Sequence, residues 1–362
     1  MGCFGGLESS WQSKTQGGKI LLWVAGLLVV WGGRVLAAQA VQVPQDGQVP
    51  TLHVYTNLVQ IPTLVLGHDL EQIKPIAENK FSVSVDSGPW FRATHVRREG
   101  DDPISLAILL DLRFGVGDFI PKLRDSLGDL APSVLHERDH VSIYVLGCDL
   151  MRSLNDVPAD TGLLQNGVDE ALRFWSTQKN VACLEQDHLW DALSYVAGQL
   201  YQLPGRRVVL AVSQGRDSGS KHTWNETRRY LQDTGVTVFG VSHAIPAINI
   251  EQKELDVFSS VCESSGGLVF RTTIPTFAAT VKTFVTTVQD RYIVEFPRPS
   301  NATAGMHEMR VKIDDGRVGL ITAAGISMPI PDPAVLADPM TVSPGPKDAP
   351  EMGTRKILTK PQ

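Results

Sequence analysis

Residues 104–111 read Ile-Ser-Leu-Ala-Ile-Leu-Leu-Asp, an almost wholly apolar run that ends in an acidic residue. Short apolar runs of this kind are typical of strands buried on both faces of a parallel sheet. Comparable runs occur at 141–146, 208–212 and 236–241, and residues 151–157 suggest a hairpin-like return. Apolar residues at helical spacing lie between these runs, in Ile120 to Val134, Leu164 to Trp175, Leu189 to Leu200, Leu255 to Cys262 and Phe277 to Val288.

This alternation of strands and helices covers residues 103–288. A polar helix is expected at Glu226 to Asp233, and Gly266-Gly267 is a typical signal for the end of a helix. The pattern predicts an α/β fold with an open, doubly wound, mostly parallel sheet and helices on both faces. Loops at the carboxyl ends of the strands are then the expected ligand-binding loops.

The flanking segments have the character of β-strands. Residues 52–100 and 290–326 contain period-two alternation, as in Phe81 to Val85, and turn signals such as Asp314-Asp315-Gly316. Pro62 is expected to break the first strand of this region. Neither segment alone is large enough for a comfortable core. We therefore predict one small β-sandwich built from both segments, with the α/β domain inserted between its halves.

Both ends of the chain differ from the rest. Residues 1–40 contain two lysines, an apolar run from Ile20 to Trp31 and the small-x-small pattern Ala38-Gln39-Ala40, which is typical of a signal peptide. The run is shorter than the roughly 20 residues that a spanning helix needs, although an uncleaved anchor is the alternative. In either case the body of the protein is expected outside the cytoplasm. Residues 329–362 contain eight prolines, which predicts a disordered tail or linker.

Composition and motifs argue against several functions. The net charge is −6 and no basic run is present, which disfavours nucleic-acid binding. The chain has no Cys-x-x-Cys pair and no Gly-rich phosphate loop. Ser213 and His243 each follow a strand, but residues 212–215 lack the Gly-x-Ser-x-Gly elbow that exposes a nucleophile. An exported hydrolase is therefore only a minor alternative.

The run at 104–111 and the order of elements after it resemble a von Willebrand factor A-like (vWA-like) domain. More specifically, residues 50–326 resemble a bacterial family of exported proteins that carry a VWFA-related domain. In that family a β segment precedes the domain and a strand with a Tyr followed by a Pro closes it, as 58–96 and Arg291-Tyr292-Ile293-Val294-Glu295-Phe296-Pro297 do here. Residues 262–270 also resemble the family's Thr-Gly-Gly-x-x-Phe-like element.

The resemblance implies where a metal site should lie. Typical A domains bind Mg²⁺ through oxygens from three loops. The first loop, Asp-x-Ser-x-Ser, is here Asp111-Leu112-Arg113-Phe114-Gly115, so Arg and Gly replace both serines. In the second loop, Asp187 occupies the Thr position before the helix start Leu189-Trp190-Asp191-Ala192-Leu193. The third loop, Ser-Asp-Gly, is here Ser213-Gln214-Gly215.

The altered loops imply a degenerate metal site. Asp111, Asp187 and, weakly, Gln214 remain as candidate Mg²⁺ ligands, whereas Arg113 places a cation where it opposes a divalent ion. The favoured interpretation is a metal-free surface in which Arg113 pairs with Asp111 or Asp187, and a modified Mg²⁺ site is the alternative. Under both interpretations these loops are the expected contact surface for a protein partner. The predicted contact residues are Asp111, Arg113, Asp187, Asp191, Ser213 and Gln214.

The cysteines add one further hypothesis. Cys148 follows the second strand and Cys183 precedes the Asp187 loop, so an A-like fold brings both near the binding loops. They either form a disulfide that braces the loops or remain two separate buried thiols. Cys262 lies on an apolar helix face and is expected in the core, and Cys3 lies in the export segment.

Taken together, these features predict an extracytoplasmic, non-catalytic protein-binding or scaffold module of vWA type. It needs no cofactor, and it meets a membrane only through an N-terminal anchor. The alternatives are a Mg²⁺-dependent adhesion-type domain and an exported hydrolase.

Overall fold

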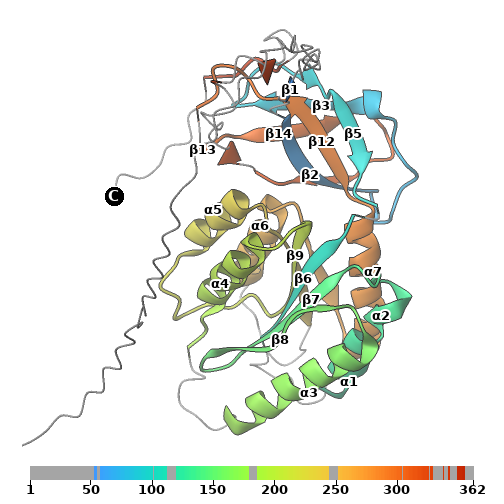
Figure 1. The fold of residues 1–362 in the computed structure, drawn as a ribbon, viewed down its shortest axis with the longest axis vertical. Helices are drawn as coiled ribbons and strands as arrows, with labels where there is room; N and C mark the ends of the chain where they lie inside the picture. Colours follow the sequence, from blue (N-terminus) through green and yellow to red (C-terminus); the bar gives the residue numbers. More distant parts are fainter. Residues whose placement is uncertain are drawn as a thin grey trace, which may run out of the picture. The chain divides into compact units, whose positions relative to one another are not determined.

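A six-stranded, mostly parallel sheet is the centre of the structure, a computed structural model (Figure 1). The structure describes residues 53–54, 58–100, 102–111, 120–178, 186–243, 252–303, 305–325, 327–328, 337, 341–342 and 349–354. The strand order is β11-β10-β9-β6-β7-β8. The strands are β6 (Ile104–Asp111), β7 (His140–Leu146), β8 (Leu150–Pro158), β9 (Arg206–Val212), β10 (Thr237–His243) and β11 (Val269–Thr272). All neighbours pair in parallel except β7 and β8, which form the expected hairpin.

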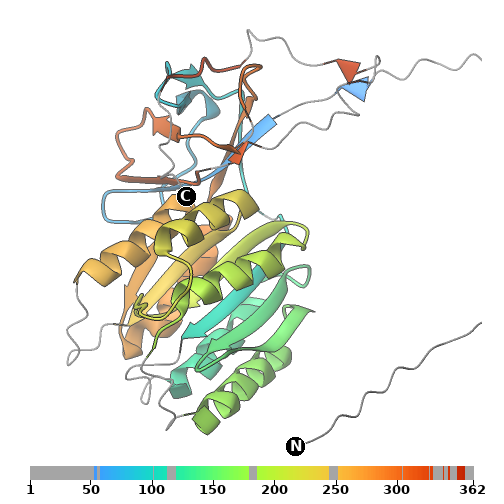
Figure 2. The ribbon, with the colours of Figure 1, turned by 90° about the vertical axis from the view of Figure 1, so that its left-hand side faces the viewer.

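Helices cover both faces of this sheet (Figure 2). They are α1 (Ile120–Gly128), α2 (Leu130–Ser133), α3 (Thr161–Gln178), α4 (Leu189–Tyr201), α5 (Trp224–Thr234), α6 (Gln252–Ser264) and α7 (Phe277–Gln289). Helices α1, α3 and α7 pack on the face that carries Leu106, Ile108 and Leu110. Helices α4, α5 and α6 pack on the face that carries Ala107 and Leu109. The predicted doubly wound α/β fold is therefore confirmed.

The first helical segment differs from the expectation of one helix over Ile120 to Val134. Helix α1 ends at Gly128, and inside α2 Ala131 has φ −109° and ψ 131°, which is extended backbone. Ala131 precedes Pro132, and the proline ring disfavours helical dihedral angles in the residue before it. The apolar spacing continues through this break, because Leu130 and Leu135 are both buried.

Helix α5 begins at Trp224, two residues before the expected start. Thr223 is its N-cap: the Thr223 Oγ1 accepts the Glu226 N–H at 3.3 Å, and the Thr223 N–H donates to Glu226 Oε2 at 2.8 Å. This reciprocal capping box satisfies two donors that the helix start would leave open. The helix ends where Gly235 takes a left-handed conformation with φ 63°.

Strands from both flanking segments alternate in two antiparallel sheets. One sheet has the order β15-β2-β12-β5 and the other β14-β3-β4. Their strands are β2 (Leu58–Leu66), β3 (Phe81–Val85), β4 (Phe91–Arg92), β5 (His95–Arg98), β12 (Tyr292–Pro297), β14 (Met309–Ile313) and β15 (Leu320–Ala323). Two-residue strands form the further pairs β1 (His53–Val54) with β17 (Thr341–Val342) and β13 (Gly305–Met306) with β16 (Ser327–Met328). The predicted union of the two flanking segments is therefore confirmed.

Strand β2 is continuous through Pro62, where a break was expected. Pro62 is opposite Ile293 in the β12 ladder, and its carbonyl accepts the Ala324 N–H at 3.0 Å. The proline lacks only the N–H donor, so its carbonyl still takes part in the sheet.

Part of the proline-rich C-terminal stretch is also ordered. Met352 forms a parallel bridge with Val85, and the Gly353 N–H donates to the Val85 carbonyl at 3.0 Å. Residues 349–354 thus pack on β3, unlike the tail expected over 329–362. Most of that stretch and the expected export segment at 1–40 lie outside the described residues. Among the described helices, none has both the length and the apolar character that crossing a bilayer requires.

A buried ion cluster joins the segments where the chain passes between sandwich and α/β domain. Glu99 follows β5, Arg291 precedes β12, and both side chains are at most 2% exposed. Arg291 Nε and Nη2 donate to the two Glu99 carboxylate oxygens at 2.9 and 2.8 Å. Arg206, at the start of β9, donates from Nη1 to Glu99 Oε2 at 3.3 Å. One carboxylate therefore holds two guanidinium groups that come from distant parts of the sequence.

Replacing Glu99 by Gln should destabilise the protein by about 3 to 5 kcal/mol, because two buried guanidinium groups would lose their shared carboxylate. Urea unfolding at pH 7 measures this change. The matched control is Glu78→Gln, which removes a carboxylate that is 60% exposed and lies 3.6 Å from the ring of His95, and it should cost no more than about 1 kcal/mol. Equal losses in the two variants would contradict the importance of the buried cluster.

Candidate functional site

The carboxyl ends of β6, β9 and β10 bring together three predicted site residues, Asp111, Ser213 and Gln214. We call this edge of the sheet, together with the loops that follow it, the top face. Ser213 Oγ donates to Asp111 Oδ2 at 2.8 Å, and the same Oγ accepts the Gly215 N–H at 3.0 Å. Ser242 Oγ donates to Gln214 Oε1 at 3.2 Å. Asp111 and Gln214 thus each accept a hydrogen bond from a hydroxyl of a neighbouring strand end.

This geometry limits the chemistry available at the top face. Ser213 is 4% exposed and its hydroxyl donates a hydrogen bond to the Asp111 carboxylate, so the hydroxyl is held as part of the scaffold. Within the described part of the chain, no group of three or more His, Cys, Asp or Glu side chains is placed to hold a metal ion. The side chain of His243, the partner required for the hydrolase alternative, lies outside the described residues.

Asp187 lies in the loop before α4 and is only 3% exposed. Its backbone carbonyl accepts the N–H groups of Ser218 and Gly219 at 3.0 and 2.8 Å, and its own N–H donates to Ser218 Oγ at 3.0 Å. These bonds attach the second predicted loop to the loop that follows β9. The structure therefore places Asp187 in a tightly bonded corner of the top face.

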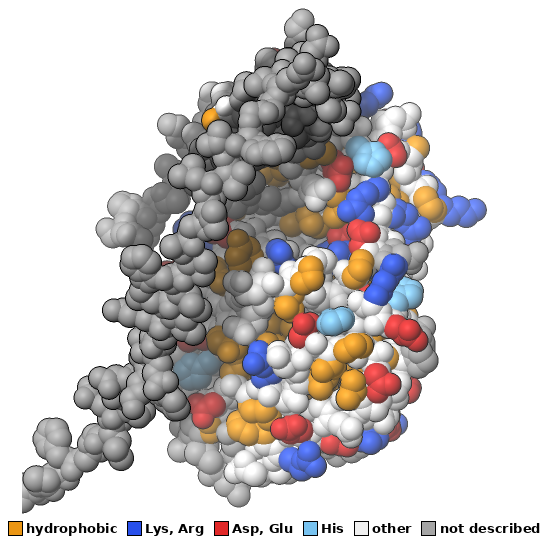
Figure 3. All heavy atoms as spheres, viewed as in Figure 1, with side chains coloured by type: hydrophobic (Ala, Val, Ile, Leu, Met, Phe, Trp, Pro, Cys, Tyr) orange, Lys and Arg blue, Asp and Glu red, His pale blue; other side chains and the backbone are white. Residues whose placement is uncertain are grey.

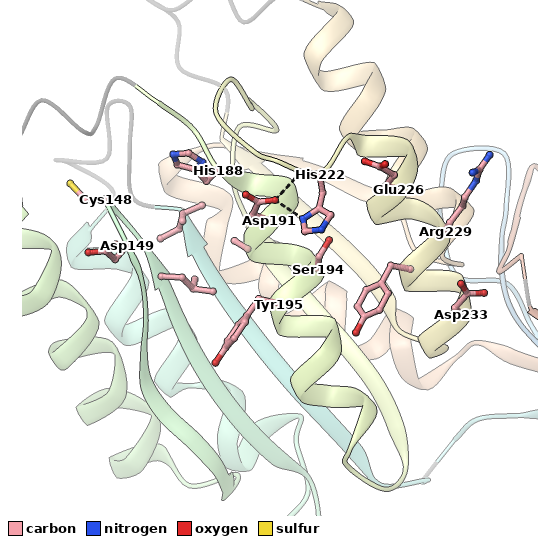
Figure 4. Close-up of a pocket in the computed structure, with 14 residues that line it drawn as sticks. Cys148, Asp149, His188, Asp191, Ser194, Tyr195, His222, Glu226, Arg229 and Asp233 are labelled. Atoms are coloured by element: carbon pink, nitrogen blue, oxygen red, sulfur yellow. Dashed lines mark hydrogen bonds and ion pairs between the residues drawn. The ribbon is translucent and has the colours of Figure 1, made fainter. Parts of the chain in front are cut away.

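Asp191, in the first turn of α4, anchors the same loop through its side chain. Its carboxylate accepts the Lys221 N–H at 2.9 Å, the His222 N–H at 3.0 Å and the His222 Nδ1 at 2.6 Å (Figure 4). Partial burial acts to raise the pKa of Asp191, but the hydrogen bonds from His222 and Lys221 outweigh it and hold this pKa below its usual value. The ionised carboxylate is therefore the form that holds the loop in place.

Some predicted residues lie outside the described part of the chain. These include Arg113, so its expected pairing with Asp111 or Asp187 stays a prediction. Cys183 also lies outside it. Cys148 is disulfide-bonded and its partner is not among the described residues, so pairing with Cys183 likewise stays a prediction. Cys262 is a buried free thiol, in accord with its expected place in the core.

A groove that the sequence did not reveal opens beside the top face (Figure 4). It has a volume of about 1050 Å³ and lies between the β7–β8 hairpin and helices α4 and α5. Tyr195 on α4 and Tyr230 on α5 line it and are 53% and 42% exposed. Its charged lining residues are Asp149, Asp191, Glu226, Arg229 and Asp233. With four carboxylates and one guanidinium, the groove is acidic and carries two exposed aromatic rings.

Packing beneath the groove positions both tyrosines. Tyr195 lies edge-on against the buried Tyr144, with 6.5 Å between ring centroids. A Cβ at Gly198 would lie 3.0 Å from the Tyr230 hydroxyl, so a side chain at this α4 position would crowd the ring. A glycine within a helix costs stability relative to alanine, and here it leaves room for an aromatic side chain from α5.

One signal in the sequence could have located this groove. Tyr195 falls outside the apolar stripe Leu189, Leu193, Val196 and Leu200, so it faces away from the sheet core. Tyr230 likewise lies beside the buried Leu231. Which helices place these rings together depends on the tertiary packing, which no local pattern contains.

Charges of both signs mix on the protein face shown in Figure 3. Lys and Arg side chains alternate there with Asp and Glu among exposed apolar groups, and no continuous basic stripe is visible in the described part.

Neither a scan against protein-family models nor a search of curated proteins finds a match. Among solved structures, proximal thread matrix protein 1 from the mussel byssus is similar with 11% identity and a TM-score of 0.40, covering 53% of this chain and 49% of that chain. The vWF domain of the type V pili tip protein Mfa5 from Porphyromonas gingivalis has 8% identity and a TM-score of 0.37, covering 52% and 95%. An aerotolerance-related membrane protein from Bacteroides fragilis has 11% identity and a TM-score of 0.34, covering 51% and 98%.

This chain spans about half the length of the mussel byssus protein. At these identities and TM-scores the similarities carry no argument about residues or function. The order and direction of the strands, with helices on both faces, give the α/β domain the vWA-like fold that the sequence predicted.

Replacing Asp191 by Asn should destabilise the protein by about 1 to 3 kcal/mol at pH 7, because charge-assisted hydrogen bonds to the loop are lost. The folded-state pKa of Asp191 is lowered, so its stabilisation is present above the unfolded-state pKa near 4 and disappears as the pH falls through the folded value. Urea unfolding at pH 7 and in acid should show the difference from wild type shrinking in acid. Asp233→Asn, at an exposed carboxylate of the same groove, is the control and should have little effect; a pH-independent loss in D191N would contradict this role.

Proposed function

We propose that this protein is an exported, non-catalytic binding module whose α/β domain contacts a protein partner through the top face and the adjoining acidic groove, without a bridging metal. The observation that carries this proposal is the groove itself, with exposed Tyr195 and Tyr230 beside loops whose polar groups already bond to one another. The apolar N-terminal run and Ala38-Gln39-Ala40 support export.

The bonding of the candidate ligands supports a metal-free top face. A Mg²⁺ ion requires near-octahedral oxygen coordination. Here Asp111 already accepts a hydrogen bond from Ser213, and the neutral Gln214 takes the place of an acidic ligand. Arg113 adds positive charge to the first loop, which further disfavours a divalent cation.

The groove has the features of a protein-contact surface. Tyrosine is enriched in interfaces and among the residues that contribute most to binding, because its ring buries a large area while its hydroxyl still bonds to water or partner. Tyr195 and Tyr230 lie on helices α4 and α5, and five charged residues line the same groove (Figure 4). An apolar centre with a polar rim is the usual arrangement of such interfaces.

His222, one of the two histidines that line the groove, supports anchoring better than catalysis. His222 and Asp191 form a pair like part of a catalytic triad, yet the backbone N–H of His222 and that of Lys221 bind the same carboxylate. The His222 side chain is 58% exposed, so water weakens its interaction with Asp191. With these three donors, the Asp191 carboxylate holds the loop in place. This anchoring role requires no nucleophile beside His222.

Isothermal titration of Mg²⁺ and Mn²⁺ into the protein lacking residues 1–40 tests the metal-free mechanism. We expect no binding heat at millimolar metal, because the ligand set is incomplete. Asp111→Ala is the control for nonspecific heats. Saturable heat that disappears in D111A would overturn the proposal and favour the Mg²⁺-dependent adhesion-type domain.

The double variant Tyr195→Ala, Tyr230→Ala should weaken partner binding by at least about tenfold without unfolding the domain, because both rings are partly exposed. Affinity for a partner identified by crosslinking at the cell envelope provides the measurement, with EDTA present throughout. Tyr201→Ala is the matched control, since Tyr201 is 52% exposed on the same helix but does not line the groove. Equal losses in the control and the double variant would exclude the groove as the contact surface.

A further inference from the structure

A second cavity lies at the opposite end of the parallel strands from the top face. It has a volume of about 350 Å³ and is bordered by the starts of β9 and β10, the segment between β5 and β6, and β12. Its charged lining residues are Arg97, Glu99, Asp102, Arg206, Arg207 and Arg291. Four guanidinium groups and two carboxylates therefore face one small space.

The positive charge in this cavity is only partly balanced. Arg97 pairs with Asp102 at 2.6 Å and lies 3.8 Å from a carboxylate oxygen of Glu295, so Glu99 is the shared partner of Arg206 and Arg291. The Arg206 and Arg291 side chains are 8% and 2% exposed, so bulk water contributes little screening. The buried cluster consequently carries a surplus positive charge.

Neutral groups satisfy the remaining bonds of Arg206 and Arg207 without cancelling that charge. Arg206 donates to the backbone carbonyls of Gly100, Asp102 and Val288. Arg207 donates to the carbonyls of Leu203 and Thr234, each at 3.1 Å. Carbonyl dipoles stabilise a cation, but the net charge of the site stays positive.

Arg291 provides an independent indication of a missing acceptor. Its Nε and Nη2 are occupied by Glu99, whereas its Nη1 is buried and has no hydrogen-bond partner in the described part of the chain. The Arg291 Cζ lies 5.8 Å from the ring centroid of Phe239, a contact that favours the cation but accepts no conventional hydrogen bond. Buried guanidinium N–H groups are normally satisfied, so this donor points to an acceptor that the protein itself does not supply.

Electrostatics around Arg206 agree with this conclusion. Burial lowers the pKa of the Arg206 guanidinium, Glu99 acts to raise it, and the neighbouring charge of Arg291 lowers it further, with a net value below the usual one. The charged form is thus less favoured here than in water, and an added negative charge would favour it.

We propose that this cavity binds a small oxyanion, a phosphate or carboxylate group, anchored by Arg291 and assisted by Arg97 and Arg207. Guanidinium groups match the geometry of oxyanions and are the usual recognition group for them. The bound anion would supply the acceptor for Arg291 Nη1 and offset the surplus charge. It would also stabilise the crossings between sandwich and α/β domain, because Glu99 and Arg291 lie in those crossings.

Thermal unfolding and calorimetry of the full-length protein with inorganic phosphate and with citrate test this site. At about 100-fold above Kd, the unfolding midpoint should rise by roughly 4 °C more than in NaCl of equal ionic strength, because only the folded state holds the anion. Titration heat should saturate at one anion per chain. A shift no larger than that with NaCl, together with the absence of saturable heat, would overturn the proposal and leave water as the occupant of the cavity.

Two substitutions that change the charge of the cavity in opposite directions distinguish a specific anion site from a general loss of stability. Arg97→Gln, at a side chain that is 38% exposed, should weaken phosphate binding roughly tenfold because one cation is removed. Glu99→Gln removes a competing carboxylate, so it should strengthen phosphate binding, and phosphate should restore part of the stability that this variant loses. Arg310→Gln is the matched control, since this arginine is 47% exposed and pairs with Glu308 outside the cavity.

Weaker binding in both R97Q and E99Q, or unchanged binding in both, would contradict the site. Should E99Q fail to fold, the comparison of R97Q with Arg310→Gln still decides, because equal affinities in these two variants would also overturn it.

Discussion

Burial of β6 on both faces is the constraint on which the other features depend. Residues 104–110 are each at most 6% exposed, so helices must cover both sides of the sheet. The strand also fixes the two ends of the domain. Its carboxyl end places Asp111 beside Ser213, which follows β9, and its amino end places Glu99 and Asp102 beside Arg206. One apolar strand therefore positions the top face and, at the other end, the arginine-rich cavity.

Local patterns were enough to predict the sheet, the helices and the union of the flanking strands, because burial makes apolar residues recur at a characteristic spacing in each strand or helix. They failed where a neighbour in space decides the backbone. Pro62 remains in a strand because Ala324 bonds to its carbonyl, and Met352 joins the sandwich because Val85 offers a free position in its ladder. The break at Ala131 is a different case: Pro132 already signals it, but the continuous apolar stripe concealed it.

The candidate site also has a part that local sequence patterns predicted and a part that depends on the tertiary fold. The sequence identified Asp111, Asp187, Asp191, Ser213 and Gln214, and the structure attaches each of them to a loop or strand end of the top face. Their bonding partners, such as His222 for Asp191, lie up to about a hundred residues away and follow only from the tertiary fold. The Tyr195–Tyr230 groove and the Glu99–Arg291 pair were missed for this reason, since the latter joins residues separated by 192 positions.

The two ends of the sheet differ in how their charged side chains are paired. At the top face, two carboxylates accept hydrogen bonds from the protein itself: Ser213 donates to Asp111, and two backbone N–H groups donate to Asp191. At the other end, guanidinium groups outnumber carboxylates and one buried donor has no acceptor within the described residues. The carboxylate of Glu99 is shared by Arg206 and Arg291 in a cavity that two further guanidinium groups line, so the ligand that the electrostatics of this end favour is an anion.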